Sequence, residues 1–524
     1  MASSRRIALN RRRLAATGAV AVPILLATAF AAPALAQEVE GPVLPAVDAG
    51  TVGLNLNLLW IVIGASLVIF MQAGFALVET GFCRAKHAAH VVSTNLMIFG
   101  LAFAGFFIVG FPLMFGGFTY PGYFGMDKPI GDAFIGSGNW VFLWKGPLML
   151  GGSGVAYTPA VMAFFLYMAA FMDTTATIPT GSMAERWKWK SFVMWGVFCG
   201  TLYYPLFGAW TWGGGWLSKL GNTASWGFGY VDFAGSGVVH AVGGAAALAG
   251  AIVLGPRLGK FGKDGKPRAL LGHNIPMATL GTFILLFGWF GFNAASTFSA
   301  TDTRFAVVAA NTAIAGAFGA VMAMVWVTIR TGKPDPSMMA NGMLAGLVAI
   351  TAPCAFVQPW AAMVIGLIAG FVVIEAVWFI ERRLKVDDPV GAISVHGVCG
   401  SLGVLSVGIF ADGQYGQGWN AMVDGEGNVV TLGGKGVVGV LYSGHGWGQL
   451  ASQLSGVVVI WTVIFGIAFG FFKLQNLLTS GGIRSEEADE IAGLDLTEMG
   501  VPAYHNGDMD PAGAASSRPS RVNA

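Results

Sequence analysis

Long hydrophobic runs, separated by short polar or charged segments, make up most of this sequence. A helix of about 20 apolar residues spans a hydrocarbon core of about 30 Å, and residues 37–474 contain eleven runs of this kind. The pattern therefore predicts an all-α membrane protein with eleven transmembrane helices, followed by a polar tail at 475–524 whose last part, 511–524, is expected to be disordered. The runs lie at 55–80, 92–116, 155–184, 191–211, 233–255, 274–297, 305–329, 338–356, 358–380, 393–411 and 450–473.

The first 36 residues have the pattern of a secretory signal peptide. Five arginines precede an apolar stretch at 14–30, and an A-x-A cleavage site at 34–36 comes directly before Gln37. We expect cleavage there, and the alternative is an uncleaved membrane anchor. Export of the N-terminus would place residue 37 in the periplasm of a bacterial cell.

The loops between the runs alternate between basic-rich and basic-poor. On the predicted count, every basic-rich loop lies opposite the N-terminus, where the positive-inside rule expects cytoplasmic loops. We therefore predict a multi-pass protein of the bacterial inner membrane with its N-terminus in the periplasm and its C-terminus in the cytoplasm. The rich loops contain Arg84 and Lys86; Arg186, Lys188 and Lys190; Arg257, Lys260, Lys263, Lys266 and Arg268; Arg330 and Lys333; and Arg382, Arg383 and Lys385.

One stretch of the sequence occurs twice. Residues 232–244, DFAGSGVVHAVGG, align without a gap on residues 388–400, DPVGAISVHGVCG. Under the predicted topology the two copies run in opposite directions, which indicates an inverted repeat of spans one to five against spans six to ten. Such folds hold their substrate near the membrane midplane. A rise of about 1.5 Å per residue places His240 and His396 about 12 Å inside, so we expect them to meet there.

Composition narrows the possible functions. The chain has 524 residues, of which 55% are hydrophobic and 11% charged, against about a quarter charged in soluble proteins. A net charge of +2 gives no basic footprint for nucleic acid. The four cysteines, Cys83, Cys199, Cys354 and Cys399, form no CxxC pair, and Cys399 lies one turn from His396. A lone cysteine in a small-residue helix generally serves packing, so we predict no metal, no cofactor and no disulfide.

The two histidines carry the candidate chemistry. Ionisable groups inside a span are costly and mark pathways, although a single such histidine is as often a hydrogen bond between helices. Two of them at repeat-related positions favour function. Neutral imidazoles both donate and accept hydrogen bonds, which suits a small polar solute that exchanges a proton.

Four other residues stand close to the repeat or to the predicted periplasmic ends of spans. Asp232 and Asp388 open their helices, where a carboxylate caps free N–H groups; capping alone is the simpler interpretation, most of all for Asp388. Trp212 precedes three glycines, and its ring would attract a cation unless it is only part of an interfacial aromatic belt. The hydroxyl of Ser296 can accept one N–H.

The sequence resembles the ammonium transporter (Amt/Rh) family across nearly the whole mature chain. The resemblance rests on the motifs DFAGSGVVH, GWFGFNAAS, VDDPVGAISVHGVCG, AGFALVETGFCRAKH and GLDLTEMGVPAY. It implies a fold of eleven helices with an inverted five-plus-five repeat, assembled as a homotrimer with one pore in each subunit. It also implies that the protein is a transporter and not an enzyme.

Site residues follow from the matching motifs. The resemblance implies that ammonium is recruited at a periplasmic vestibule, passes a phenylalanine gate and then meets twin pore histidines. It assigns Trp212, Ser296 and Phe171 to recruitment, with Asp232 supporting that site, Phe171 and Phe292 to the gate, and His240 and His396 to the pore.

Four residues depart from the family pattern or are unusual in a span. Asp173 and Glu375 are carboxylates inside predicted spans, and we expect them to form hydrogen bonds within the bundle or to alter the field in the pore. Tyr167 replaces a commoner phenylalanine. Met499 stands where the family often has histidine in the tail, which puts in doubt the coupling of the tail to a PII-type regulatory protein.

The sequence therefore predicts uptake of ammonium, and possible transport of methylammonium, across the inner membrane. The cation loses its proton at the gate because a bare charge in a dry pore is costly, and ammonia passes the histidines with separate transfer of H⁺. Two alternatives remain. An ammonium sensor on the same scaffold would bind the ion but conduct little, and a membrane haem protein would use His240 and His396 as axial ligands.

Overall fold

The computed structural model describes residues 48–120, 124–151, 155–421, 435–444 and 446–504. The predicted signal peptide at 1–36 and the tail end at 511–524 lie outside these residues. The chain forms two compact units, Met1–Val52 and Gly53–Ala524. In the first, the Asp48 carboxylate accepts the Thr51 N–H at 3.0 Å. Everything that follows concerns the second unit.

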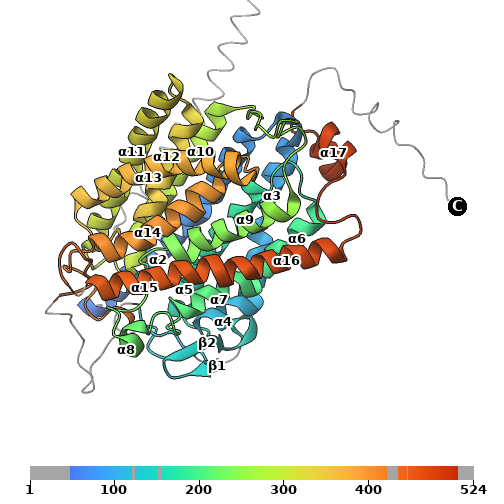
Figure 1. The fold of residues 1–524 in the computed structure, drawn as a ribbon. Coiled ribbons are helices and arrows are strands. Elements are labelled where there is room, and N and C mark those ends of the chain that lie inside the picture. Colours follow the sequence, from blue (N-terminus) through green and yellow to red (C-terminus); the bar gives the residue numbers. More distant parts are fainter. Residues whose placement is uncertain (1–47, 121–123, 152–154, 422–434, 445, 505–524) are drawn as a thin grey trace, which may run out of the picture. The chain divides into compact units, whose positions relative to one another are not determined.

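The described residues form an all-α multi-pass fold in which ten helices are long and apolar enough to cross a membrane. This confirms the all-α multi-pass class, with ten long spans in the described residues where eleven were predicted (Figure 1). The ten spans are α2 (Ala49–Phe82), Ala85–Phe115, α5 (Pro159–Ser182), Trp189–Trp210, Ser236–Leu254, Ile275–Thr297, α11 (Arg304–Thr331), Pro359–Leu384, Ile393–Phe410 and Gly446–Leu478.

Most of the other spans change their helical winding along their length, so that α-helix alternates with short 3₁₀ or π-helical segments, labelled η. These pieces are η1 (Ala85–His87), α3 (Ala88–Gly105), η2 (Phe106–Gly110) and α4 (Phe111–Phe115); α6 (Trp189–Phe198), η4 (Cys199–Tyr203) and α7 (Tyr204–Trp210); η5 (Ser236–Ala241) and α9 (Val242–Leu254); α10 (Ile275–Trp289), η6 (Phe290–Ala294) and η7 (Ala295–Thr297); α13 (Pro359–Phe379) and η8 (Ile380–Leu384); η9 (Ile393–Val398) and α14 (Cys399–Phe410); and α15 (Gly446–Val459), η11 (Ile460–Ile464) and α16 (Phe465–Leu478).

The predicted run at 338–356 is a shorter helix than expected. It forms α12 (Pro336–Ile350), which has 15 residues. Beyond it the backbone turns to pair with the loop before η5: the Phe233 N–H donates to the Ala352 carbonyl at 3.2 Å, and the Ala352 N–H donates to the Ser236 hydroxyl at 2.7 Å. Pro353 also lacks the N–H that a continuing helix needs. These bonds fasten the start of η5 to the end of α12.

The two ends of the helices carry different structures. Strands β1 (Asp132–Ser137) and β2 (Trp140–Lys145) form an antiparallel hairpin, with Asp132 opposite Lys145, between the second and third predicted spans. The hairpin lies near α4, α7 and the short helix α8 (Leu220–Ala224) (Figure 1). The remaining short turns are η3 (Leu148–Leu150) and η10 (Trp419–Ala421).

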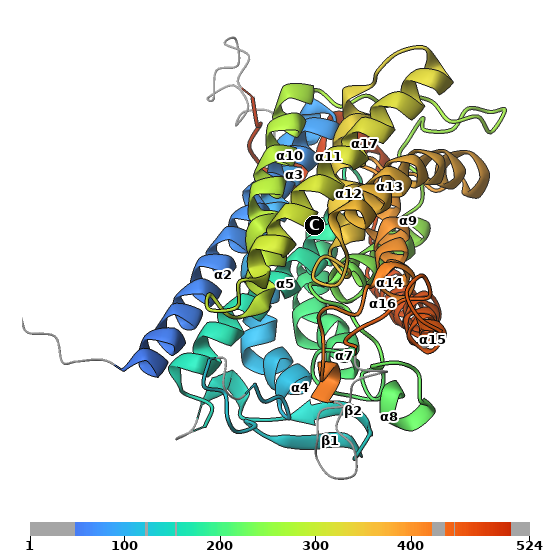
Figure 2. The ribbon, with the colours of Figure 1, turned by 90° about the vertical axis from the view of Figure 1, so that its left-hand side faces the viewer.

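The described part of the tail docks at the other end of the helices, where Figure 2 shows α17 (Glu487–Ala492) far from the hairpin. Glu490 accepts the Leu258 N–H at 2.6 Å. Asp495, in η12 (Asp495–Met499), accepts the His90 N–H at 2.9 Å. The tail is therefore bonded both to the loop after α9 and to the start of α3.

A buried network of charges holds the loops at the tail end. Arg257 donates to Asp387 at 2.8 Å and lies 3.1 Å from Glu185, which also pairs with Arg84. Burial would raise the pKa of Asp387, but Arg186 and Arg257 outweigh it and hold that pKa well below its ordinary value. Burial likewise opposes ionisation of Glu185, yet Arg257 and the neighbouring basic groups lower its pKa. Both carboxylates are therefore ionised.

Candidate functional site

Both histidines lie in π-helical segments that an aspartate introduces. His240 is in η5 and His396 is in η9. The Asp232 carboxylate accepts the N–H groups of Gly235 at 2.8 Å and Gly237 at 2.9 Å, three and five residues on. At the same offsets Asp388 accepts the N–H groups of residues 391 and 393, at 3.0 and 2.7 Å. The repeat in the sequence thus produces the same capped start of both helices.

The two capped helices cross with their glycines in contact. A Cβ on Gly244 would overlap the backbone of Gly397, and one on Gly400 would meet the backbone of Ala241. Gly244 contacts Gly397, whereas Ala241, earlier in the first helix, contacts Gly400, later in the second. The two helices are therefore antiparallel where they touch. The two contacts also exchange under the repeat offset of 156 residues. Small residues let the backbones approach this closely.

This crossing brings His240 and His396 together, as the sequence predicted. Their Nδ1 atoms are 3.1 Å apart, and their ring centroids are 5.2 Å apart. Both side chains are buried, with 0% and 5% of their surface exposed. One Nδ1 must therefore carry a hydrogen while the other accepts it. The Nε2 of His240 has no hydrogen-bond partner among the described residues.

Aromatic rings continue from His240 towards the hairpin end. The ring of His240 stacks on Phe292 at 5.4 Å between centroids, and Phe292 stacks on Phe171 at 4.0 Å. Trp212 meets Phe171 edge to face at 5.9 Å. Both phenylalanines are buried. We call Phe171, Phe292, His240 and His396 the ring stack.

Ser296 and Trp212 lie on the other side of the stacked phenylalanines from the histidines. The Ser296 hydroxyl is 3.0 Å from the Tyr167 hydroxyl and donates to the Phe292 carbonyl at 2.7 Å. Tyr167, which replaces a commoner phenylalanine, thus contributes a polar group beside Ser296. The Trp212 indole N–H donates to the backbone carbonyl of Asp232 at 2.7 Å. Trp212, Phe171 and Ser296 together are called the aromatic vestibule below.

Asp232 lies next to Trp212 of the aromatic vestibule, and backbone N–H groups already bind its carboxylate. It is 1% exposed and its oxygens accept backbone N–H groups. Burial raises the pKa of Asp232, which those N–H groups oppose. Its carbonyl, in contrast, fixes the Trp212 ring. The side chain therefore builds the local backbone and does not project towards a ligand.

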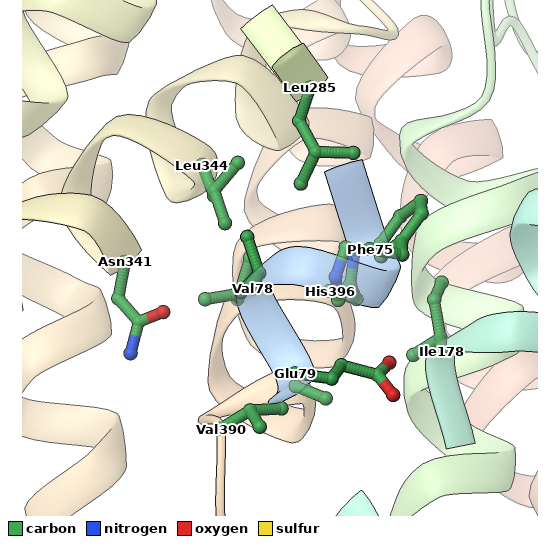
Figure 3. A pocket seen from close by; sticks show the side chains of 11 residues that line it. Phe75, Val78, Glu79, Ile178, Leu285, Asn341, Leu344, Val390 and His396 are labelled. Atoms are coloured by element: carbon green, nitrogen blue, oxygen red, sulfur yellow. The ribbon is translucent and has the colours of Figure 1, made fainter. Parts of the chain in front are cut away.

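A cavity lies on the other side of the histidine pair. His396, Glu79 and Asn341 are its polar lining, and the other eight lining side chains are apolar. Figure 3 shows Glu79 and Phe75 projecting from α2 towards the space beside His396. We call this the inner cavity. Sequence reasoning missed Glu79, although an ionisable residue in a hydrophobic run is itself a signal of function.

Asp173 and Glu375, the two carboxylates noted in the predicted spans, are not among the residues that line the inner cavity. Asp173 is 2% exposed, and its Oδ1 has no hydrogen-bond partner among the described residues. Glu375 accepts from Trp326 Nε1 at 2.8 Å and pairs with Arg330 at 2.9 Å. Its side chain is 37% exposed, so Glu375 forms the expected hydrogen bonds on the outside of the bundle and not in its interior.

Comparisons with known proteins agree on one family. The sequence profile of the Ammonium Transporter Family matches residues 59–504. Ammonium transporter Amt2 of Archaeoglobus fulgidus is 44% identical over 492 residues, which is 93% of this chain and 94% of that protein. Ammonium transporter 1 member 3 of Solanum lycopersicum is 33% identical and covers 86% of this chain and 93% of its own.

Solved structures resemble the fold as well. A structure named Sensor Amt Protein has a TM-score of 0.70 and 34% identity, and covers 85% of this chain and 99% of its own. The crystal structure of Candida albicans Mep2 has a TM-score of 0.66 and 28% identity, with coverages of 83% and 87%.

Proposed function

Because the chain belongs to the ammonium transporter family, whose members are membrane transporters and not enzymes, we propose that it strips ammonium of a proton and passes ammonia between its twin histidines. The observation that carries this mechanism is the 3.1 Å contact between His240 and His396, buried beneath stacked phenylalanines. Two neutral imidazoles line the path with hydrogen-bonding nitrogens, while apolar rings exclude water.

Desolvation explains why a proton must leave. Moving a bare cation into a medium of low dielectric costs far more than moving the neutral molecule, and ammonium escapes that cost by giving up H⁺. K⁺ has no proton to lose, so the same dry path excludes it. The selectivity therefore follows from the burial of the ring stack, with Phe292 and His240 both 0% exposed.

The aromatic vestibule is the proposed recruitment site. The faces of Trp212 and Phe171 attract a cation, and the attraction grows as the ion loses water. Ser296 offers its hydroxyl oxygen to one N–H of the ion. Asp232 supports this site through the carbonyl that holds Trp212 and makes no contact with the ion in this proposal.

Uptake into liposomes tests the mechanism. The purified protein should carry ammonium or methylammonium and exclude K⁺, while the double variant His240→Ala, His396→Ala should lose at least tenfold in rate or admit K⁺. His273→Ala is the matched control, because His273 lies outside the ring stack and bonds to Tyr504 and the Cys83 carbonyl. Unchanged rate and K⁺ exclusion in the double variant would refute the role of the histidines.

We also propose the finer topology. Counting α12 gives eleven spans, and the capped antiparallel helices of His240 and His396 support an inverted five-plus-five repeat. The proposal places the N-terminus outside after signal-peptide cleavage at 1–36, the transporter domain at 37–474, and the tail at 475–524 inside the bacterial inner membrane. Labelling of single cysteines in β1 and in the 485–504 segment from each side of the membrane decides the orientation.

The assembly is proposed from the family alone. A homotrimer would leave one pore in each subunit, and the tail end is the proposed docking face for a PII-type regulatory protein. Mass measurement of the protein in lipid nanodiscs, alone and with a PII protein, tests both parts.

Sensing is the second candidate function, because the solved structure with a TM-score of 0.70 is named a sensor. A sensor would bind ammonium at the aromatic vestibule without sustained flux. Binding in detergent together with uptake no faster than in empty liposomes would favour it. The haem alternative does not fit the geometry: iron between two imidazoles needs about 4 Å between the nitrogens, twice a metal–nitrogen bond of about 2 Å, and the Nδ1 atoms are 3.1 Å apart.

A further inference from the structure

One carboxyl group, that of Glu79, lines the inner cavity, and the proposed mechanism so far assigns it no role. Glu79 is 2% exposed and lines the cavity together with His396. We propose that Glu79 is the inner proton-exchange group of the pore, which receives a proton by way of His396 and returns it to ammonia, so that ammonium leaves the cavity. This inference rests on the proposed function and adds to it the site where the cation forms again.

The hydrogen bonds of Glu79 accommodate both of its protonation states. Asn95 Nδ2 donates to Glu79 at 2.7 Å. The Thr180 hydroxyl is 2.9 Å from both carboxyl oxygens of Glu79 and 2.5 Å from the Thr177 carbonyl. A hydroxyl has one hydrogen. If Thr180 directs it to Thr177, the contact with Glu79 requires a proton on the carboxyl group; if Thr180 turns, it donates to the carboxylate.

Rotation of the Thr180 hydroxyl therefore accommodates both the acid and the carboxylate. Gly181 leaves room for the carboxyl group because it has no side chain. A Cβ at this position would lie 3.0 Å from Glu79 Oε1 and 2.5 Å from Cγ2 of Val390. A purely structural carboxylate deep in a helix bundle is normally paired with a cation. The side-chain contacts of Glu79 are instead with the Asn95 amide and the Thr180 hydroxyl.

Atoms and charge balance for one transfer without any further reactant; the transfer leaves each imidazole in its other tautomer, which must be reset before the next one. At the gate ammonium loses H⁺ to the Nε2 lone pair of His240. The Nδ1 hydrogen of His240 moves to Nδ1 of His396, and the Nε2 hydrogen of His396 moves through the inner cavity to the Glu79 carboxylate. The Glu79 O–H bond then breaks as the nitrogen lone pair of ammonia takes the proton, which leaves carboxylate and ammonium. One positive charge crosses for each ammonium.

Two other titratable groups face Glu79. His396 lines the same cavity, and Asp388 is a nearby second carboxyl group. The Asp388 oxygens already accept the N–H groups of Gly391 and Ile393. Glu79 is thus the only one of the two carboxyl groups that lines the inner cavity.

The experiment measures the current that follows an ammonium jump on proteoliposomes adsorbed to a solid support, over a series of pH values. In Glu79→Gln the amide keeps the size of the side chain but exchanges no proton, so the current should fall at least tenfold. Glu79→Asp should conduct more than Glu79→Gln, with a pH profile displaced from the parent's. Asp173→Asn is the matched control: it removes another buried carboxyl group that does not line the cavity, and it should conduct like the parent.

Infrared difference spectra cover the case in which Glu79→Gln folds poorly. Ammonium added to the parent should change a carboxylic acid C=O band, and Glu79→Asp should shift that band. A Glu79→Gln current within twofold of the parent's at every pH overturns the inference, as does an equal loss in Asp173→Asn or a carboxyl band that ignores ammonium and the Glu79→Asp change. If the parent protein gives neither uptake nor current, the proposed transport function itself fails.

Discussion

Gly244→Ala tests whether the contact between the repeated helices sets the distance between the histidines. A Cβ at Gly244 would overlap the N and Cα atoms of Gly397 and lie 3.0 Å from the carbonyl carbon of His396. Carbon atoms pack at about 3.5–4.0 Å, so the backbones would have to separate by roughly 1 Å. The Nδ1 atoms, now 3.1 Å apart, would then be about 4 Å apart, beyond hydrogen-bond distance.

Both stability and transport should respond. Overpacking of this kind costs about 1–3 kcal/mol, and an error of about 1 Å between groups that exchange a proton can cost about 100-fold in rate. We therefore expect a lower melting temperature in detergent and a loss of roughly 10- to 100-fold in the ammonium current of proteoliposomes.

Gly466→Ala is the matched control, since a Cβ there would meet nothing within 4 Å. It makes the same chemical change in a membrane-spanning helix and should leave both the melting temperature and the current unchanged or slightly raise the former, because alanine favours helix over glycine by about 1 kcal/mol. If Gly244→Ala matches this control in both measurements, close helix packing does not hold the histidine pair.

Two further predictions concern the charge network and the vestibule. Asp387→Asn leaves the buried Arg257 short of a charge partner and should cost about 3–5 kcal/mol, whereas Glu375→Gln, at the part-exposed pair with Arg330, should cost at most about 1 kcal/mol in the same thermal melts. Because the pKa of Asp387 is lowered in the folded protein, its contribution is complete above about pH 4 and is lost as the pH falls through the folded value, so acid should destabilise the parent more than Asp387→Asn. Trp212→Leu removes a cation–π contact worth about 0.5–2 kcal/mol and should raise the half-saturating ammonium concentration about 2- to 30-fold in current titrations; an unchanged value would remove Trp212 from recruitment.

Long hydrophobic segments and duplicated motifs are the parts of this fold that the sequence predicts. The hydrophobic runs identified the all-α multi-pass class because a membrane span needs about 20 apolar residues wherever it lies. The meeting of His240 and His396 followed from a gapless duplicated motif, because copies with the same cap and the same glycines cross at the same depth. Each of these signals involves many residues, so local irregularity does not erase it.

Local backbone events were not predictable in the same way. The 3.6-residue period of an α-helix does not distinguish the wider turns of η5 and η9, in which both histidines lie. The end of α12 at Ile350 depends on bonds to a loop more than a hundred residues earlier. The hairpin did carry a signal, since a short turn containing Gly138 separates two apolar stretches, and Gly138 has a φ of +55°.

Side-chain environments were the hardest to predict, because lipid and protein interior are equally apolar. A helix apolar on all faces does not reveal which face meets its neighbours, so Glu375 was expected in the interior although it reaches Arg330 at the surface. Glu79 is an example of a residue in the interior. It lies beside His396 because helices distant in sequence pack together, and the local sequence around Glu79 carries no information about that packing.

The two halves of the repeat share a backbone but differ in what surrounds each histidine. His240 stacks on Trp289 and Phe292, whereas His396 borders a cavity with a carboxyl group and an amide. The shared caps and glycines fix the distance between the two imidazoles. The different surroundings of His240 and His396 decide how the proposed mechanism binds a cation on each side. Since every proton transfer is reversible, this asymmetry cannot set the direction of net flux, which follows the gradients of ammonium and voltage. What it can set is affinity, because in the proposed mechanism ring faces bind a partly hydrated cation on one side and a carboxylate binds it on the other.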